Sequence, residues 1–418
     1  MPIDKFKDVT RYLDDIPSVR QNVSDLSARF ELGEEPAEVS TEETAEELDG
    51  KLSGEAESSS EDSASSSHFA PVRVSTCIQE SIDFLAGEEA KKLVSREPYW
   101  PKWNSPWWHA LLLEEMGLAS AIPSHFVEHY AAVVDQHYLH FFPFTEEEIP
   151  AGVSPIFNIA CHCYLGSLYR LLSAGENFDH DLKLTDGRVL AGKTAVARTI
   201  PSDCFDATPE HERALNWVRP WFLKYQISGG GLNCDESNYL KETPSCSVLS
   251  TLPALEALVA IDSNLLSEEE LAFLDNGVTY LIERNLFRSK RTGEVVDPTW
   301  LEPAFPRFYF YDVLRGLTLV TRWALKRSRK LPQSAIAEAM HVLNQQISRE
   351  GFVPKRSNVQ ERKTIIRTDL GHEKDHPVSS FALLEAVDQV GQPSLHLTQE
   401  YLGLLLRLKY MSDARLLR

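Results

Sequence analysis

The sequence predicts an all-α protein, built as an α/α toroid of about five to six inner and outer helix pairs. Three observations support this class. Segments with apolar residues at helical spacing recur from about residue 74 onward. More apolar segments alternate with more polar ones, as expected for two helix layers. A preceding acidic, Ser-rich stretch has no such pattern, so we predict a disordered tail there.

The N-terminal region divides into two parts before the predicted toroid. Residues 31–68 hold thirteen Asp or Glu against one Lys, which places most of the formal net charge of -20 there. Charge repulsion and low hydrophobicity predict disorder for residues 31–70. Within residues 1–30, the apolar residues 6, 9, 13 and 16 lie near helical spacing and would offer a face to a protein partner. The predicted toroid spans residues 71–418.

Five segments rich in apolar and small residues are predicted to be inner helices: residues 107–118, 156–172, 246–261, 308–323 and 377–390. Each follows a more polar segment that we predict to be an outer helix: residues 81–93, 124–140, 209–226, 267–285 and 333–347. The outer segment after Ser267 begins with three Glu, which favour the positive end of a helix dipole.

Charge and hydropathy exclude several partners. Outside the tail the chain is mildly acidic and has no Lys/Arg surface to neutralise phosphates, so we predict no nucleic-acid partner. No apolar run is long enough to span a bilayer, so we predict no transmembrane segment. The N-terminus lacks a basic stretch followed by an apolar run and a cleavage site, and a cytoplasmic location is the expectation.

Residues 224–234 read Lys-Tyr-Gln-Ile-Ser-Gly-Gly-Gly-Leu-Asn-Cys. This stretch resembles the Gln-then-Gly-Gly turn that closes an outer helix in the terpenoid cyclase and protein prenyltransferase superfamily, which includes the squalene cyclases. Residues 246–258 and 308–317 look like inner helices of that superfamily. The likeness covers residues 75–410 in layout, and it implies a toroid with an apolar or isoprenoid-like substrate in its cavity.

The starts of parallel inner helices would converge on one rim of the toroid. Four cysteines at or before such starts are predicted metal ligands, because Zn²⁺ binds sulfur, imidazole and carboxylate groups: Cys161, Cys163, Cys234 and Cys246. Asp235 and His376 could also contribute to this site, and we predict both as catalytic residues. The resemblance sharpens this choice, since prenyltransferases hold zinc with Asp-x-Cys and a later His. The order here is Cys234 before Asp235. Alternatively, each cysteine packs as a small hydrophobe.

Asp312 is the third predicted catalytic residue. On a helix it would share one face with Tyr309 and could act as an acid in an aromatic cavity. Predicted substrate-binding residues at the same rim are Trp108, His109, Arg307, Tyr309 and Tyr311. Aromatic faces suit an apolar substrate and can stabilise a developing cation. The alternative role for Asp312 is a salt bridge with Arg315 or a contact at the helix start.

These observations predict an enzyme that acts on a small apolar molecule or a peptide, with Zn²⁺ or a rim acid as its catalytic element. The alternative is a non-catalytic toroid that binds a peptide or a lipid. It is motivated by the absence of the Asp-x-Asp-Asp and Asp-Asp-x-x-Asp motifs on which cyclases depend.

Overall fold

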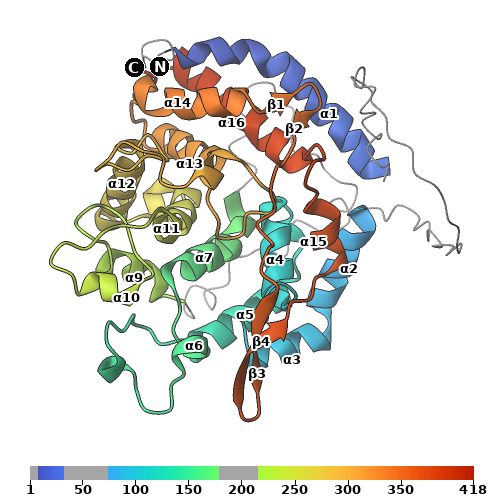
Figure 1. Cartoon of the computed structure of the whole chain (residues 1–418), viewed down its shortest axis with the longest axis vertical. Coiled ribbons are helices and arrows are strands. Elements are labelled where there is room, and N and C mark those ends of the chain that lie inside the picture. The colour runs from blue at the N-terminus through green and yellow to red at the C-terminus, as the bar shows by residue number, and fades with distance from the viewer. Residues whose placement is uncertain (1–7, 33–73, 178–214) are drawn as a thin grey trace, which may run out of the picture.

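The computed structural model describes residues 8–32, 74–177 and 215–418, and the predicted tail at 31–70 lies almost wholly outside these residues (Figure 1). A 3-10 helix, Val9–Asp15, precedes the first α-helix. The described α-helices are α1 Ile16–Leu32, α2 Val74–Ala86, α3 Glu88–Arg96, α4 Pro106–Glu115, α5 Ser124–His137, α6 Pro155–Asn158, α7 His162–Asn177, α9 Val218–Lys224, α10 Glu236–Tyr239, α11 Val248–Ala260, α12 Glu268–Ile282, α13 Val313–Lys326, α14 Gln333–Asn344, α15 Ala382–Val387 and α16 Leu395–Asp413.

The described part is mostly helical, which confirms the all-α class at that level. Its strands form two antiparallel pairs, β1 Ile347–Ser348 with β2 Gly351–Phe352 and β3 Lys363–Thr368 with β4 Gly371–Pro377. None of the described helices is long and apolar enough to cross a membrane.

The predicted inner helices differ from the outer ones in burial. Nine of the 10 residues of α4 are buried, as are 10 of 13 in α11 and 11 of 14 in α13. Only 4 of the 14 residues of α5 are buried, so this helix has one apolar face and one exposed face. Helix α12, another predicted outer helix, begins with a capping box formed by Ser267 and Glu270.

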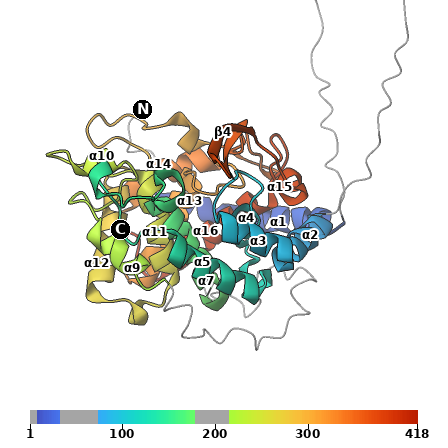
Figure 2. The same ribbon diagram turned by 90° about the horizontal axis from the view of Figure 1, so that it is seen from below.

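Neighbouring helices are held by close packing. Helix α7 packs against α4 and α11, and α13 packs against α11, α14 and α16. A Cβ at Gly166 of α7 would lie 2.4 Å from the Ala254 nitrogen, so the two backbones touch where α11 contains Pro253. Helix α15, near the end of the sequence, packs against α2, which lies some three hundred residues earlier (Figure 2). Closure of these helices into a toroid stays a prediction.

The N-terminal segment belongs to the same apolar core as the rest of the described chain. Val9, Tyr12 and Val19 are buried. The 3-10 helix packs against α14 and α16, and α1 runs along α16 (Figure 1). Of the apolar face that we predicted to meet a protein partner, Val9, Leu13 and Ile16 pack into this chain's own core, and residue 6 lies outside the described residues.

Three predicted inner helices need correction. Residues 371–377 form strand β4, and only Ala382–Val387 is helical within 377–390. Helix α13 begins at Val313 rather than at residue 308, because Asp312 is its N-cap and Phe308 has a φ of 53°. Tyr309 and Asp312 consequently do not share a helix face. The predicted helix 156–172 is interrupted between α6 and α7, and the start of 209–226 lies outside the described residues.

Candidate metal centre and its surroundings

Three cysteines converge although one is far from the other two in sequence. Cys161 lies directly before α7, Cys163 lies in its first turn, and Cys234 lies before α10. The Cys161 and Cys163 sulfurs are 3.0 Å apart, and all three Sγ atoms lie within 4.8 Å of one another. A tetrahedral zinc site with Zn–S bonds of about 2.3 Å places its sulfurs about 3.8 Å apart. The three thiols are of the type that zinc binds and are close enough to hold it, provided that Cys161 and Cys163 Sγ separate by about 0.8 Å.

Local hydrogen bonds position Cys161 and Cys234. The Tyr164 N–H donates to Cys161 Sγ at 3.4 Å, as a helix start leaves its first N–H groups free to do. The Cys234 N–H donates to Ser250 Oγ at 2.9 Å, and the Leu232 N–H donates to Thr251 Oγ1 at 2.8 Å. Helix α11 therefore anchors the loop that carries Cys234.

The glycine-rich turn that we singled out in the sequence shapes this loop. Gly230 has a φ of 94°, and a Cβ there would lie 2.5 Å from the Asn276 carbonyl oxygen. The Gln226 side chain closes the turn by donating to the Gly230 carbonyl oxygen at 2.8 Å and to that of Phe273 at 3.0 Å. The turn thus delivers the chain to Cys234 by a path that requires glycine.

The thiols share their protons unequally. Hydrogen bonds from Cys161 and Cys163 hold the pKa of Cys234 well below its usual range. Hydrogen bonding to Cys161 and Cys234, together with burial, raises the pKa of Cys163. Cys234 is therefore the first thiolate of the cluster. A soft divalent metal would displace the remaining protons, since thiolates are its ligands.

His162, between the two cysteines, is not available as a ligand. Trp221 Nε1 donates to His162 Nδ1 at 2.7 Å, so His162 Nε2 carries the proton and donates to Tyr239 Oη at 3.0 Å. Burial lowers the pKa of His162 and keeps the ring neutral. The Tyr239 hydroxyl also accepts from the Asn233 N–H at 3.1 Å, next to Cys234. His162 and Tyr239 thus connect the two cysteine segments.

The other predicted metal-site residues lie elsewhere. Cys246 is not in the three-sulfur group, and its Sγ accepts from the Gly231 N–H at 3.2 Å. Asp235 is exposed and caps α10 by accepting from the Ser237 N–H at 3.0 Å. His376 is half-exposed on β4, 3.8 Å from Glu373. The strand at 371–377 explains its position, because the predicted helix would have brought it to the rim.

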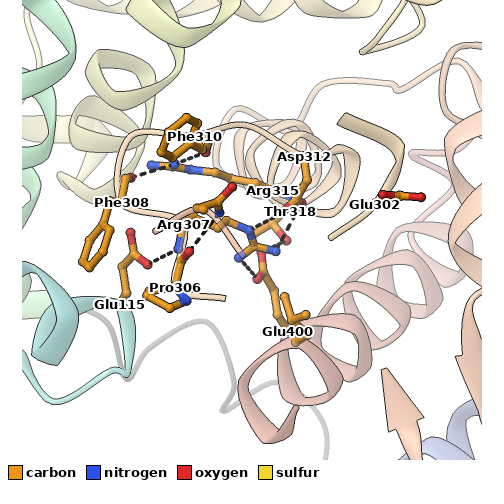
Figure 3. A network of polar contacts seen from close by, with 12 residues as sticks. Glu115, Glu302, Pro306, Arg307, Phe308, Phe310, Asp312, Arg315, Thr318 and Glu400 are labelled. Carbon is orange, nitrogen blue, oxygen red and sulfur yellow. Dashed lines mark hydrogen bonds and ion pairs between the residues drawn. The ribbon is translucent and has the colours of Figure 1, made fainter. Parts of the chain in front are cut away.

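Asp312 is fully buried, and both of its oxygens are bonded. One oxygen accepts from Arg307 Nε at 2.5 Å, and the other accepts from the Arg315 N–H at 2.9 Å as the cap of α13 (Figure 3). This is the helix-start role that we considered as the alternative to acid catalysis. Arg307 also pairs with Glu400 of α16.

The same ion pairs extend across the helices around α13. Arg315 donates to both oxygens of Glu256 at 2.7 Å and to the backbone oxygens of Phe308 and Phe310. Arg170 of α7 pairs with Glu256 and with Glu114, each at 2.6 Å. Below, the ion-pair network means Glu114, Arg170, Glu256, Arg307, Asp312, Arg315 and Glu400. It joins α4, α7, α11, α13 and α16.

Of the predicted substrate-binding residues, Tyr309 is half-buried and the others are buried. Trp108 is fully buried, and its Nε1 donates to the Pro101 oxygen at 3.1 Å. His109 is buried against Phe381, which lowers its pKa to about 3. Tyr311 is buried and donates to the Leu286 oxygen at 2.9 Å. These three side chains are committed to the core.

An aromatic pocket lies beside the Tyr239 end of the cluster. It has a volume of about 720 Å³ and is lined by Phe141, Phe142, Phe144, Glu148, Lys224, Tyr225, Gln226, Ile227, Ser228, Tyr239 and Pro244. Phe144 and Tyr239 stack at 4.9 Å between ring centroids. Volume and lining are those of a small-molecule site with a few polar groups. The sequence reasoning missed this pocket, although the aromatic run at 141–144 was a signal.

Lys102 and Glu361 were also missed. They form an ion pair of 3.0 Å next to Tyr309. Lys102 is a lone cation in a run of aromatic residues at 99–108, which is the signal that could have drawn attention to it. Glu361 precedes the β3–β4 hairpin, in a stretch between residues 348 and 376 to which we assigned no helix.

Comparisons with known proteins give no relative. No family model matches the chain, and no curated protein or solved structure matches it either. The resemblance to the terpenoid cyclase and prenyltransferase superfamily stays a prediction.

Proposed function

We propose that this protein is a metal-dependent transferase in which Cys161, Cys163 and Cys234 bind Zn²⁺ and an apolar substrate binds in the aromatic pocket. The three converging thiols carry this proposal. Three protein ligands leave one coordination position for a substrate or water, which is the pattern of catalytic rather than structural zinc. When bound, zinc would lower the pKa of a protic ligand at that position.

The residues around the thiols support a positioned site. Ser250 and Tyr164 orient the cysteines through backbone contacts, and His162 fixes the loop of Cys234 through Tyr239. Such outer contacts commonly tune ligand geometry in metal centres. We further propose that the helices close into a toroid, in which the starts of the inner helices bring the cysteine segments together.

The aromatic pocket supports an apolar substrate. Tyr239 belongs both to its wall and to the hydrogen-bond chain that ends at Asn233. A ligand that packs on Phe144 and Tyr239 would therefore lie one hydrogen bond away from the Cys234 loop. An isoprenoid-like or aromatic group fits these walls, because apolar and ring surfaces pack well on aromatic faces.

A non-catalytic toroid that binds a peptide or lipid is the second candidate. It is favoured by the commitment of Asp235 and Asp312 to helix caps, which removes two of the three predicted catalytic residues from chemistry. Under this alternative the aromatic pocket binds the peptide or lipid. A metal held by the three cysteines would then exchange neither substrate nor water.

Metal binding is tested by the metal content of the purified full chain and by titration with Co²⁺. We expect one zinc per chain and the intense absorption of cobalt bound to thiolates. Cys163→Ser should weaken metal binding by more than about 100-fold, because even outer contacts are worth about 10- to 100-fold. Cys246→Ser is the matched control and should bind like the wild type. Equal metal binding by Cys163→Ser and the wild type would reject the centre.

A further inference from the structure

The sulfurs of Cys161 and Cys163 lie at a separation between those of two chemical states. They are 3.0 Å apart. A disulfide bond would bring them to about 2.05 Å, whereas a tetrahedral zinc ion would hold them about 3.8 Å apart. Each state therefore differs from the observed separation by about 1 Å. The reduced pair can approach a metal-bound state or a covalent bond, but these two states exclude each other.

The backbone around the pair allows the covalent bond. Side chains two residues apart on a helix do not face each other, but Cys161 lies outside α7, which begins at His162. The two side chains therefore turn to the same side, and their sulfurs meet. Residues two apart have Cα atoms about 5–7 Å apart, which overlaps the separation found in disulfides. A disulfide is within reach of this backbone.

The residue between the two cysteines is held by the core. His162 accepts from Trp221 Nε1 at 2.7 Å and donates to Tyr239 Oη at 3.0 Å. These bonds restrict the stretch of backbone that joins the two thiols. Holding two reacting groups together in advance raises the effective concentration of one at the other, so the reaction between the two sulfurs is favoured.

An oxidant can reach this pair more easily than it can reach Cys77. Cys161 and Cys163 are half-buried, whereas only 1% of Cys77 is exposed. Cys246 is also half-buried, but it does not belong to the group of sulfurs that converge among the described residues. Cysteines that are accessible and lie next to a second thiol are the ones that oxidise reversibly to a disulfide.

We infer that Cys161 and Cys163 form an oxidative modification site, at which a peroxide converts the two thiols into a disulfide that cannot hold the metal. The disulfide itself depends only on the sulfur pair. Its effect on metal binding rests on the proposed function, because thiolates are the metal ligands and the bond would leave Cys234 as the single one of the three.

The reaction is balanced with hydrogen peroxide as the oxidant. The thiolate of one cysteine attacks a peroxide oxygen, so an S–O bond forms, the O–O bond breaks and hydroxide leaves. The sulfur of the other cysteine then attacks the sulfenic acid, so the S–S bond forms, the S–O bond breaks and a second hydroxide leaves. The two thiol protons convert both hydroxides to water. Each sulfur loses one electron, and the peroxide gains two.

The test treats the purified full chain, freed of metal by a chelator, with one equivalent of hydrogen peroxide and alkylates it after denaturation. Trypsin leaves Cys161 and Cys163 together on residues 103–170, and it leaves Cys234 on residues 225–241. We expect the first peptide to carry no alkyl group and to weigh two hydrogen atoms less than the reduced peptide, while Cys234 is alkylated. Dithiothreitol should restore alkylation of the first peptide.

Two variants define which thiols take part. Cys234→Ser should form the disulfide to the same extent as the wild type, because the bond needs only the other two sulfurs. Cys246→Ser is the matched control and should also behave like the wild type. A cross-link between residues 103–170 and Cys234, or a gain of oxygen on either cysteine without an S–S bond, would overturn the inference.

Cobalt binding separates this inference from the proposed function. The oxidised chain should bind Co²⁺ at least about 100-fold more weakly than the reduced chain from which the reductant has been removed. Equal cobalt binding by both forms would overturn the effect on the metal. A chain that forms the disulfide but shows no thiolate–cobalt absorption when reduced would reject the metal centre alone. A chain that shows this absorption but forms no disulfide with peroxide would reject the modification site alone.

Discussion

The thiol centre and the ion-pair network each contain residues that were predicted to lie at one functional rim, the cysteines in the first and Arg307 and Asp312 in the second. The two regions differ in how many of their polar atoms are already bonded. In the network, the three guanidinium nitrogens of Arg307, those of Arg315 and both oxygens of Asp312 are all bonded within the protein (Figure 3). At the centre, three thiols converge without a fourth donor among the described residues. Apart from Arg170 Nε, which has no hydrogen-bond partner, the buried charges of the network are bonded within the protein and act as scaffold. Unsatisfied donors and acceptors instead indicate a site.

The largest effect is expected from breaking the network. Arg315→Met leaves Glu256 buried with one of its two cations removed, and losing one partner of a buried pair costs about 3–5 kcal/mol. The free energy of unfolding should fall by this amount in denaturant titrations. Arg288→Met removes a half-exposed pair with Glu338 and should cost at most about 1 kcal/mol. Similar losses for both variants would contradict the scaffold role.

A pH dependence of stability should follow from Glu256. Burial alone would raise the pKa of this carboxyl, but Arg315 and Arg170 lower it to about 2. Because the folded pKa is below the unfolded value of 4.5, the stabilisation is present above pH 4.5 and is lost as the pH falls toward 2. The loss should be roughly 3 kcal/mol.

Burial raises the pKa of Glu114 and Glu115, which therefore favour the folded state at lower pH and partly oppose this trend. Unfolding of the wild type and of Glu256→Gln, measured at several pH values between about 2 and 5, separates the contributions. The variant should lose less stability over this range. An unchanged slope would show that Glu256 is not the titrating group.

A smaller effect is expected from the turn before Cys234. Gly230→Ala forces a side chain into a left-handed conformation against the Asn276 backbone, which should cost about 1–3 kcal/mol. Metal affinity should fall as well, because the turn positions the Cys234 loop. Gly293 also has a positive φ, of 73°, but an added Cβ would meet no atom within 4 Å. Gly293→Ala therefore tests the conformational cost alone. A loss of stability without any loss of metal affinity would separate the turn from the centre.

Much of the helical layout could be predicted from the sequence. Apolar spacing located α4, α11 and α14, and the Ser267 cap with its three Glu marked the start of α12. Strand β3 was missed, although Lys363–Thr368 contains β-branched residues suited to a strand. Helix α16 was not assigned either. Positions 308–312 look helical by composition, but Pro306 and the N-cap at Asp312 place them in a loop.

The site could be predicted only in part. Sequence reasoning selected Cys161, Cys163 and Cys234 but included Cys246, since spacing along the chain does not say which thiols meet. Their convergence depends on the packing of α7 against α11, where Gly166 allows close approach. Glu361 carried no signal, because its significance is one unpartnered oxygen, and that is a property of the folded neighbourhood alone.

The convergence of Cys163 with Cys234 also bears on how the chain assembles. A metal held by these residues would cross-link the backbone across about seventy residues, and the entropy of closing such a loop depends only weakly on its length. Each doubling of the intervening chain would cost only about 0.6 kcal/mol. Insertions or deletions between α7 and α9 should therefore change the free energy of folding only slightly, provided that Cys163 and Cys234 still meet.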